Sequence, residues 1–372
     1  MVLKILVSPA STHYFTDKAG SIYSISYNLL FSLDALGIRL YPLINNLDPN
    51  ATVSPNIQFI RVGQEIEYGS ECSKWSDIRF LVKSYRLSKK LIKKENIDII
   101  HHMTPFLYGV SFNLLIMSSE LSKYPFIIGP AEIPHMFLYD DYLYIWGETH
   151  SYIKLEWNVV RFLRKMTKLF LRPLSLKTLD KCNILIAVNE ATKKGYSKVM
   201  SNKKIRVIPL GVDLNEFKFS EPPLNHDILT VGLHIQRKGF DYLIKAMPKI
   251  LKEYPEARLH IPSSGPRTDI LKALVRNLGI ESNVIFHGYL SRNELLELYK
   301  SCRVFCHPSL SEGFCHTTLE AMATGRPVVS TNTVGSEMVE NEKTGFLVPT
   351  ADSDAIADGI LKVFNDEELT YK

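Results

Sequence analysis

The sequence has no long apolar segment, and this absence excludes one class of protein at the outset. No window of the chain reaches the ~18 consecutive apolar residues that a membrane-spanning helix needs. The start of the chain, MVLKILVSPA, also lacks the pattern of a secretory signal peptide, because polar loop residues follow its short apolar run where a small-residue cleavage site would stand. We therefore expect a cytoplasmic protein.

Cysteine is scarce as well. The chain has five cysteines, an odd and scattered set that does not suggest a disulfide framework and so favours a reducing compartment: Cys72, Cys182, Cys302, Cys306 and Cys315. Two of them, Cys302 and Cys306, flank the residues RVF, but no further metal ligands lie at a suitable spacing. We expect buried thiols here rather than a metal site.

No dense basic face is evident. The formal net charge is only +5, which is too mild to indicate a nucleic-acid partner. The charge is unevenly distributed at one place, residues 159–173. Apolar residues recur there with helical spacing, basic residues fill the other faces, and no acid occurs between Glu156 and Asp180. A basic amphipathic helix of this kind can lie on an anionic membrane surface, on the inner face of the membrane here. A surface helix that packs on its own domain is the alternative.

The sequence has no internal repeat and no low-complexity tract. Instead, short apolar runs rich in β-branched residues alternate with helical patterns throughout, which predicts an α/β fold with parallel sheets covered by helices. A stretch with adjacent prolines and no helical period, 208–227, separates two such series. We therefore expect two domains, 1–207 and 208–372. The predicted strands are 3–8, 38–43, 57–62, 97–102, 126–129, 183–189, 204–210, 227–232, 257–263, 283–290 and 303–309.

The segment SEGFCHTTLEAMATG, 311–325, places two acids, Glu312 and Glu320, on either side of an expected helix start. It follows an expected strand, and ligands of open α/β sheets bind at the carboxyl ends of strands. The N–H groups at the start of a helix bind phosphate. One acid could therefore meet a sugar and the other a ribose, with phosphates between them.

This segment resembles the E-x7-E signature of retaining glycosyltransferases of family 4, which have the GT-B fold of two Rossmann-like domains that face each other across a cleft. The resemblance extends over residues 183–365 through KIRVIPLGVDLNEF, VGLHIQRKGFDYLIKAM, VIFHGYLSRNELLELYKSCRVFCHPSLSEGF and TLEAMATGRPVVSTNTVGSEMVENEKTGFLVPTAD. It implies that the first domain holds the acceptor and the second domain holds the nucleotide-sugar donor, a UDP- or GDP-sugar.

The resemblance also implies roles for single residues, of which Glu312 and Lys238 are the catalytic ones. This sequence departs from the family at Leu233, where the family has an arginine that binds the donor diphosphate. Arg237 is the residue that could supply the missing positive charge, and His234 is a weaker candidate. Glu312 would contact the donor sugar, and Glu320 the ribose. The full set of donor-binding residues is Gly20, Arg237, Tyr289, Leu290, Glu312, Cys315, His316, Thr317 and Glu320.

The first half of the chain resembles the family less closely. Gly20 follows the first strand where the family has a glycine loop, but the usual doubled glycine reads Ala19-Gly20. Candidates on the acceptor side are His13, His101 and His102. A histidine that ends a strand is more often a packed or capping residue, so both interpretations stay open for these three.

The family reaction retains the anomeric configuration, and charge stabilisation of the departing diphosphate dominates it. The resemblance therefore implies neither a metal nor a cofactor. The residues DSD at 352–354 match the D-x-D metal motif of another glycosyltransferase fold. They come just before a helical pattern, however, so we predict that they cap a helix.

We thus expect a retaining, metal-independent glycosyltransferase that moves a hexose-type sugar to a glycan or lipid-linked glycan in polysaccharide biosynthesis. A nucleotide-sugar epimerase, a phosphorylase of the same fold, or a binding subunit with a decayed site is the alternative. Members of the family carry a last helix that returns to the first domain, whereas this chain stops at Lys372, soon after a helical pattern near 355–365. Truncation or loss of that helix would loosen the packing between domains.

Overall fold

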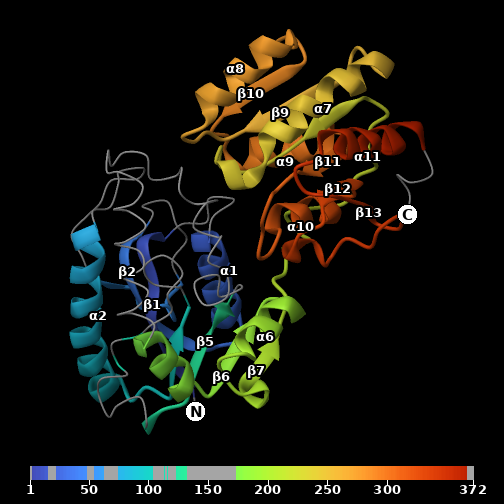
Figure 1. The fold of residues 1–372 in the computed structure, drawn as a ribbon. Helices are drawn as coiled ribbons and strands as arrows, with labels where there is room; N and C mark the ends of the chain where they lie inside the picture. Colours follow the sequence, from blue (N-terminus) through green and yellow to red (C-terminus); the bar gives the residue numbers. More distant parts are fainter. Residues whose placement is uncertain are drawn as a thin grey trace, which may run out of the picture. The chain divides into compact units, whose positions relative to one another are not determined.

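The protein, seen in a computed structural model, is described at residues 2–15, 22–47, 54–62, 74–103, 113, 115, 123–131 and 173–366. These residues form two compact units, and the chain passes from the first to the second between Pro209 and Leu210. That point lies two residues beyond the boundary expected from the sequence. Each unit contains one sheet whose strands all pair in parallel (Figure 1).

The first unit has a seven-stranded sheet with the order β3-β2-β1-β4-β5-β6-β7. Its helix α2 packs Phe80 and Ile92 against the sheet, in a core with strand residues such as Leu6 and Ile100. The elements are β1 (Lys4–Phe15), α1 (Ile22–Ala35), β2 (Arg39–Leu47), β3 (Ile60–Arg61), α2 (Lys74–Glu95), β4 (Ile99–His102), β5 (Phe126–Ala131), β6 (Ile184–Ala187), α6 (Glu190–Tyr196), η4 (Asn202–Lys204) and β7 (Ile205–Val207).

The second unit has a six-stranded sheet with the order β10-β9-β8-β11-β12-β13. Its elements are β8 (Asp227–Leu229), η5 (Gln236–Lys238), α7 (Phe240–Glu253), β9 (Arg258–Pro262), α8 (Thr268–Leu278), β10 (Val284–Gly288), α9 (Arg292–Ser301), β11 (Val304–His307), α10 (His316–Ala323), β12 (Val328–Thr331), η6 (Val334–Ser336), β13 (Gly345–Val348) and α11 (Ser353–Asn365). Helix α7 buries Phe240, Leu243, Ile244, Met247 and Ile250, which follow a helical spacing, against this sheet.

Every strand expected from the sequence overlaps a strand of the structure, and the expected α/β class is confirmed. Two strands, β12 and β13, were not predicted. Both are four residues long, and β13 begins at Gly345, whose added Cβ would lie 2.3 Å from the Val328 carbonyl oxygen. A glycine is therefore needed where β13 starts beside β12.

The two ends of β8 carry different side chains. Asp227 opens the strand, is buried, and accepts hydrogen bonds of 2.9 and 2.7 Å from Nε and Nη2 of Arg258. Burial opposes the charge of Asp227, but the nearby His260, 3.7 Å away, and the hydrogen bonds from Arg258 outweigh this effect and lower the pKa of this carboxyl. The carboxyl end of the same strand leads into the loop that holds Arg237 and Lys238.

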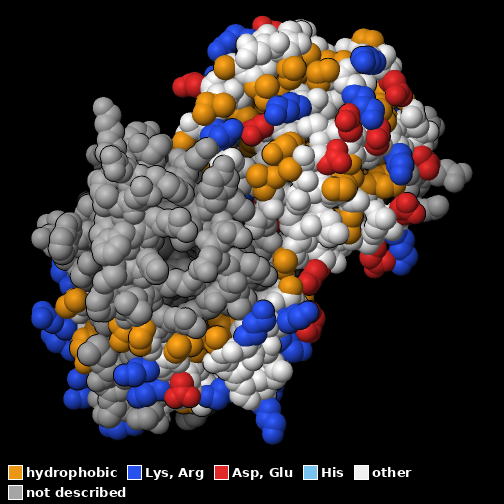
Figure 2. Space-filling view, in the orientation of Figure 1, with side chains coloured by type: hydrophobic (Ala, Val, Ile, Leu, Met, Phe, Trp, Pro, Cys, Tyr) orange, Lys and Arg blue, Asp and Glu red, His pale blue; other side chains and the backbone are white. Residues whose placement is uncertain are grey.

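Asp352 confirms the expected cap. Its carboxylate accepts a hydrogen bond of 2.9 Å from the Ala355 amide at the start of α11, so the DSD residues serve as a helix terminus. No helix in the described part of the chain is long and apolar enough to cross a membrane. On the face shown in Figure 2, cations predominate over the coloured part of the first unit, whereas both signs of charge intermingle over the second.

Candidate functional site

The strand order of the second unit places two loops at a switch point. From β8 the chain proceeds outward to β9 and β10, whereas from β11 it proceeds in the opposite direction to β12 and β13. The loops after β8 and β11 therefore diverge, and such a crevice at the carboxyl ends of parallel strands is where α/β proteins bind ligands. The first loop contains Arg237 and Lys238, and the second contains Glu312.

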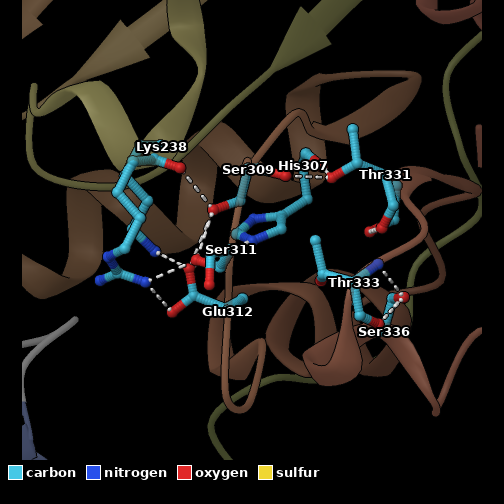
Figure 3. A network of polar contacts seen from close by, with 10 residues as sticks. Lys238, His307, Ser309, Ser311, Glu312, Thr331, Thr333 and Ser336 are labelled. Carbon is cyan, nitrogen blue, oxygen red and sulfur yellow. Dashed lines mark hydrogen bonds and ion pairs between the residues drawn. The ribbon is translucent and has the colours of Figure 1, made fainter. Parts of the chain in front are cut away.

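These three charged side chains meet in the structure. Lys238 Nζ lies 3.0 Å from Glu312 Oε2, and Arg237 Nη1 lies 2.7 Å from Glu312 Oε1. Ser309 Oγ adds a hydrogen bond of 3.1 Å to Oε2, so that Lys238 and Ser309 both point toward the carboxylate (Figure 3). The sequence predicted Arg237, Lys238 and Glu312 as site residues, and the fold brings them together.

Glu312 is buried yet charged. Burial alone would raise its pKa, but the positive charges of Lys238 and Arg237 outweigh that effect and hold the pKa of this carboxyl well below its usual range. His307 Nε2 lies 3.7 Å from the same carboxylate, and burial lowers the pKa of this imidazole. Two cations thus share one carboxylate, which leaves a net positive charge at the crevice.

Two glycines allow this packing. Gly239 has φ +65°, and an added Cβ would lie 2.1 Å from the Pro308 carbonyl oxygen, so the turn after Lys238 touches the backbone that leads to Glu312. At Gly232 an added Cβ would lie 3.2 Å from Lys238 Cε, so the lysine stem lies against bare backbone. Lys238 is therefore followed by a glycine because a larger residue at position 239 would clash with the Pro308 backbone.

Helix α10 begins directly after the Glu312 loop. Cys315 is its N-cap residue, and the Cys315 side chain makes no capping hydrogen bond. The Cys315 amide donates to the Gly335 carbonyl at 3.3 Å, and the His316 amide contacts the Phe314 carbonyl at 3.2 Å. His316 is half-buried and Thr317 is buried. The helix start, with its partial positive charge, thus lies next in the chain to the Arg237–Lys238–Glu312 group.

Glu320 lies one turn further along α10 and is fully buried. Tyr299 donates a hydrogen bond of 2.9 Å to Glu320 Oε2, while Arg292 Nη1 and His316 Nδ1 lie 3.5 and 3.4 Å from Oε1. The second acid of the motif therefore has its own set of partners, separate from those of Glu312.

The remaining donor-side residues differ in exposure. Tyr289, at the end of β10, is 74% exposed, and Leu290 is half-buried. Leu233 is 52% exposed at the position of the family arginine. His234, the weaker substitute for that arginine, is fully buried, with ring nitrogens 2.9 Å from Thr268 Oγ1 and 3.3 Å from the Pro262 carbonyl. His234 therefore packs inside the unit, whereas Arg237 pairs with Glu312.

The first unit has its own switch point, between β1 and β4. His101 and His102 end β4 there, and both are buried. His101 Nε2 lies 2.8 Å from the Gly129 carbonyl oxygen, and His102 Nδ1 lies 3.4 Å from Asn113 Nδ2. His13 belongs to β1, but its side chain lies outside the described residues, as do Gly20 and the whole of 159–172.

Several residues of the site were not predicted from the sequence. Ser309 Oγ lies within hydrogen-bond distance of both Glu312 Oε2 and the Arg237 carbonyl oxygen, at 3.1 and 2.9 Å, and can donate its single proton to either. Gly335 braces the Glu312 loop, because its amide donates to the Glu312 carbonyl at 2.9 Å. Arg292 and Tyr299 contact Glu320. The only signal for these residues was their place inside the segments that resemble the family.

Within the described residues, no three His, Cys, Asp or Glu side chains are grouped so that they could hold a metal ion. Cys182, Cys302, Cys306 and Cys315 are buried free thiols. Burial raises the pKa of Cys182 and of Cys302 to about 12, so both stay protonated at neutral pH and behave as apolar groups.

Two family models match the chain. The model described as Glycosyltransferase Family 4 matches residues 27–216, and the model described as Glycosyl transferases group 1 matches residues 213–372. Among curated proteins, an uncharacterized glycosyltransferase of Methanocaldococcus jannaschii is 35% identical over 208 residues, which is 51% of this chain and 53% of that protein.

A second curated relative is the GDP-mannose-dependent alpha-(1-6)-phosphatidylinositol monomannoside mannosyltransferase of Mycobacterium tuberculosis, 26% identical over 51% of this chain and 54% of that protein. The chain thus spans about half the length of these curated relatives. Among solved structures, sucrose-phosphate synthase from Thermosynechococcus elongatus superimposes on this chain with a TM-score of 0.74 and 20% sequence identity. The match covers 100% of this chain and 91% of the synthase chain. With the family matches, this likeness confirms the expected GT-B fold class.

Proposed function

The chain belongs to glycosyltransferase family 4, and from this premise we propose that it transfers a sugar from a nucleotide-sugar donor to a hydroxyl of a glycan or lipid-linked glycan. The observation that carries the proposal is the buried contact of Glu312 with Arg237 and Lys238 beside the start of α10, where the N-cap residue Cys315 makes no side-chain capping hydrogen bond. This group has the charge and position that a nucleoside diphosphate requires.

The diphosphate of a UDP- or GDP-sugar is the ligand that fits this charge. Arg237 and Lys238 together carry two positive charges against the single negative charge of Glu312, and the start of α10 adds a partial positive charge. On this proposal the donor sugar lies against Glu312 and the ribose against Glu320. Backbone groups of Tyr289 and Leu290 contact the base.

The chemistry that follows from this arrangement is electrostatic. As the bond between sugar and diphosphate breaks, negative charge grows on the leaving oxygen, and Lys238 with the α10 amides stabilises it. The acceptor hydroxyl attacks from the same face and gives its proton to that oxygen, so the anomeric configuration is retained. We propose that these cations supply the charge that a divalent metal supplies in other transferases. Full activity in EDTA would support that part.

A lipid-linked acceptor at a membrane surface is the more specific form of the proposal. The mycobacterial relative acts, by its name, on a phosphatidylinositol mannoside. In the described residues, helix α2 of the first unit presents exposed cations along its length at Lys83, Arg86, Lys90, Lys93 and Lys94. Anionic headgroups attract such a face.

Leu233 favours one other candidate, a subunit that binds a nucleotide sugar without turning it over. Its apolar side chain is 52% exposed where the family has an arginine, so one expected cation is missing. Assays of the full chain with UDP-, GDP- and ADP-sugars and a pool of glycan acceptors separate the two. Transfer with a retained anomeric configuration, read by NMR of the product, supports the enzyme, whereas binding without transfer supports the subunit.

The direct test of the diphosphate site is Lys238→Met. We expect this change to lower the affinity for the preferred nucleoside diphosphate by about tenfold to a hundredfold, because a charge-assisted contact contributes about 1.5–3 kcal/mol. Isothermal titration calorimetry measures it. Lys252→Met is the matched control, since Lys252 is an exposed lysine of α7. Equal affinity in the wild type and Lys238→Met would show that the diphosphate lies elsewhere.

A further inference from the structure

His307, the last residue of β11, lies buried beside the carboxylate of Glu312 (Figure 3). Its Nε2 lies 3.7 Å from Glu312 Oε2, which is too far for a hydrogen bond. Among the residues that the structure describes, this buried Nε2 has no hydrogen-bond partner. Such an atom is rare in native proteins, because leaving it unpaired costs free energy. The imidazole is therefore placed next to Glu312 without bonding to it.

The histidine is held in this position from two sides. Thr331 Oγ1 donates to the His307 carbonyl oxygen at 3.2 Å, and the imidazole lies nearly parallel to the Phe305 ring, with 6.4 Å between the ring centres. A movement of the Glu312 carboxylate by about 1 Å would bring Nε2 and Oε2 to the distance of a charge-assisted hydrogen bond. The contact can therefore form without a change in the strand.

Glu312 depends on two cations that a diphosphate would also attract. Arg237 and Lys238 neutralise it at 2.7 and 3.0 Å, and their side chains are 14 and 15% exposed, whereas that of His307 is only 2% exposed. A ligand in the crevice can therefore reach the cations but not the imidazole. Phosphate oxygens compete with Glu312 for both cations. Glu312 is then a buried charge with weaker compensation, which is costly.

The charges around His307 determine whether it binds a proton. Within the described ranges, Glu312 acts on it from the loop after β11, Lys238 and Arg237 act from the loop after β8, and β12 contributes Thr331, which does not titrate. Burial lowers the pKa of His307 most strongly, Glu312 opposes this effect, and the two cations lower the pKa further. A diphosphate brings negative charge and draws the cations away from Glu312. Both changes favour the protonated imidazole.

We propose that His307 takes up a proton when the nucleotide sugar binds and replaces Lys238 as the cation that faces Glu312. The proton comes from the solvent, Nε2–H donates to Glu312 Oε2, and Lys238 turns to the diphosphate. This inference rests on the proposed function and adds a positioning residue to it. His307 does not touch the substrate, but it keeps Glu312 charged and oriented toward the donor sugar.

The test is isothermal titration calorimetry of the full chain with UDP-glucose, GDP-mannose and ADP-glucose in buffers of different ionisation enthalpy, which counts the protons taken up on binding. Nucleotide sugars are used because their diphosphate is esterified at both ends and does not titrate near neutral pH. We expect the wild type to take up about half a proton or more per preferred nucleotide sugar near pH 6. Its affinity should then fall about threefold per pH unit, because linkage ties this slope to the number of protons bound.

Two variants separate this role from a structural one. His307→Gln does not titrate, so it should bind without proton uptake and with an affinity that does not change with pH. His226→Gln is the matched control and should keep the uptake, because His226 faces Glu256 at 2.7 Å and precedes β8, at the amino end of the sheet. If His307→Gln does not fold, nitrogen-15 NMR of the wild type replaces it. The ring signals of His307, assigned by contact with Phe305, should change to those of an imidazolium as the nucleotide sugar is added.

Three results would contradict the proposals at different levels. A wild type that binds a nucleotide sugar without proton uptake between about pH 5.5 and 7.5 overturns the role of His307. Uptake that persists in folded His307→Gln overturns it too, because another group then takes the proton. A wild type that binds none of the three nucleotide sugars overturns the proposed function and this inference together.

Discussion

His101 shows at the scale of one residue how burial decides what a side chain can do. Its imidazole is fully buried at the end of β4, and its Nε2 lies 2.8 Å from the Gly129 carbonyl oxygen. Burial lowers the pKa of this histidine to about 4, which outweighs the opposite effect of the Gly129 hydrogen bond. A general base at neutral pH works best with a pKa near 7 and with access to its substrate. These properties fit the packed interpretation that the sequence left open.

The lowered pKa of His101 predicts a pH dependence of stability. The unfolded chain binds a proton near pH 6.5 and the folded chain only near pH 4, so stability is complete above pH 6.5 and is lost as the pH falls toward 4. The whole effect is about 3 kcal/mol. We expect His101→Gln, which does not titrate, to show a shallower fall in unfolding free energy over this range in urea titrations. Equal slopes in the two proteins would contradict the prediction.

The sequence predicts single residues of the site better than their contacts. Lys238 and Glu312 follow from the resemblance to the family, because the segments around them match the family in order and spacing. Ser309 does not follow, since its role depends on where Oγ points once β11 has ended. Arg292 and Glu216 lie 76 positions apart, and no local pattern records a pair that only the fold creates.

At the scale of an element, the turn from η5 into α7 sets the position of the loop that holds Arg237 and Lys238. Gly239 ends the turn at φ +65° and touches the Pro308 carbonyl oxygen, so the loops after β8 and β11 are held at a fixed separation. The elements around it were predicted well, because buried parallel strands give continuous apolar runs. The strands β12 and β13 were missed because each has only four residues, with serine and threonine at the end of β12 and glycine at the start of β13, which leaves too short an apolar pattern.

Gly239→Ala should therefore damage both stability and binding. The left-handed φ costs alanine about 1–2 kcal/mol, and the clash of Cβ with the Pro308 oxygen adds about 1–3 kcal/mol. Gly279→Ala is the matched control, because Gly279 has φ +66° at the end of α8 but no atom within 4 Å of an added Cβ. Guanidinium unfolding and nucleotide calorimetry should show a larger loss of stability for Gly239→Ala and a loss of affinity confined to it. Equal losses would refute the close contact.

At the scale of the whole molecule, the two units share one plan, a parallel sheet with a switch point. Apolar alternation along the sequence was enough to predict this plan, and the chain passes between units close to the expected boundary. The basic segment 159–173 is a prediction of a different kind. It rests on charge pattern alone, and most of it lies outside the described residues.

The membrane prediction is tested by charge reversal. Arg164→Glu combined with Lys168→Glu should weaken sedimentation with liposomes that contain anionic lipid, by about 1 kcal/mol or more per cation removed from the surface. The control is Lys252→Glu with Arg276→Glu, which changes the net charge equally on exposed helices of the second unit. Unchanged sedimentation of the Arg164→Glu, Lys168→Glu variant, or an equal loss of sedimentation in this variant and the control, would contradict the membrane interpretation.

The two ends of β8 have different roles, so the stability of the protein and its ligand binding can be engineered separately. Asp227 and Arg258 lock the amino end of the strand, and the loop with Lys238 leaves its carboxyl end. On the proposed function, we expect substitutions that strengthen the Asp227–Arg258 pair to raise thermal stability without changing the affinity for the nucleotide, and substitutions in the loop at the carboxyl end to change that affinity. Stability and ligand binding are thus assigned to opposite ends of one strand and can be altered separately.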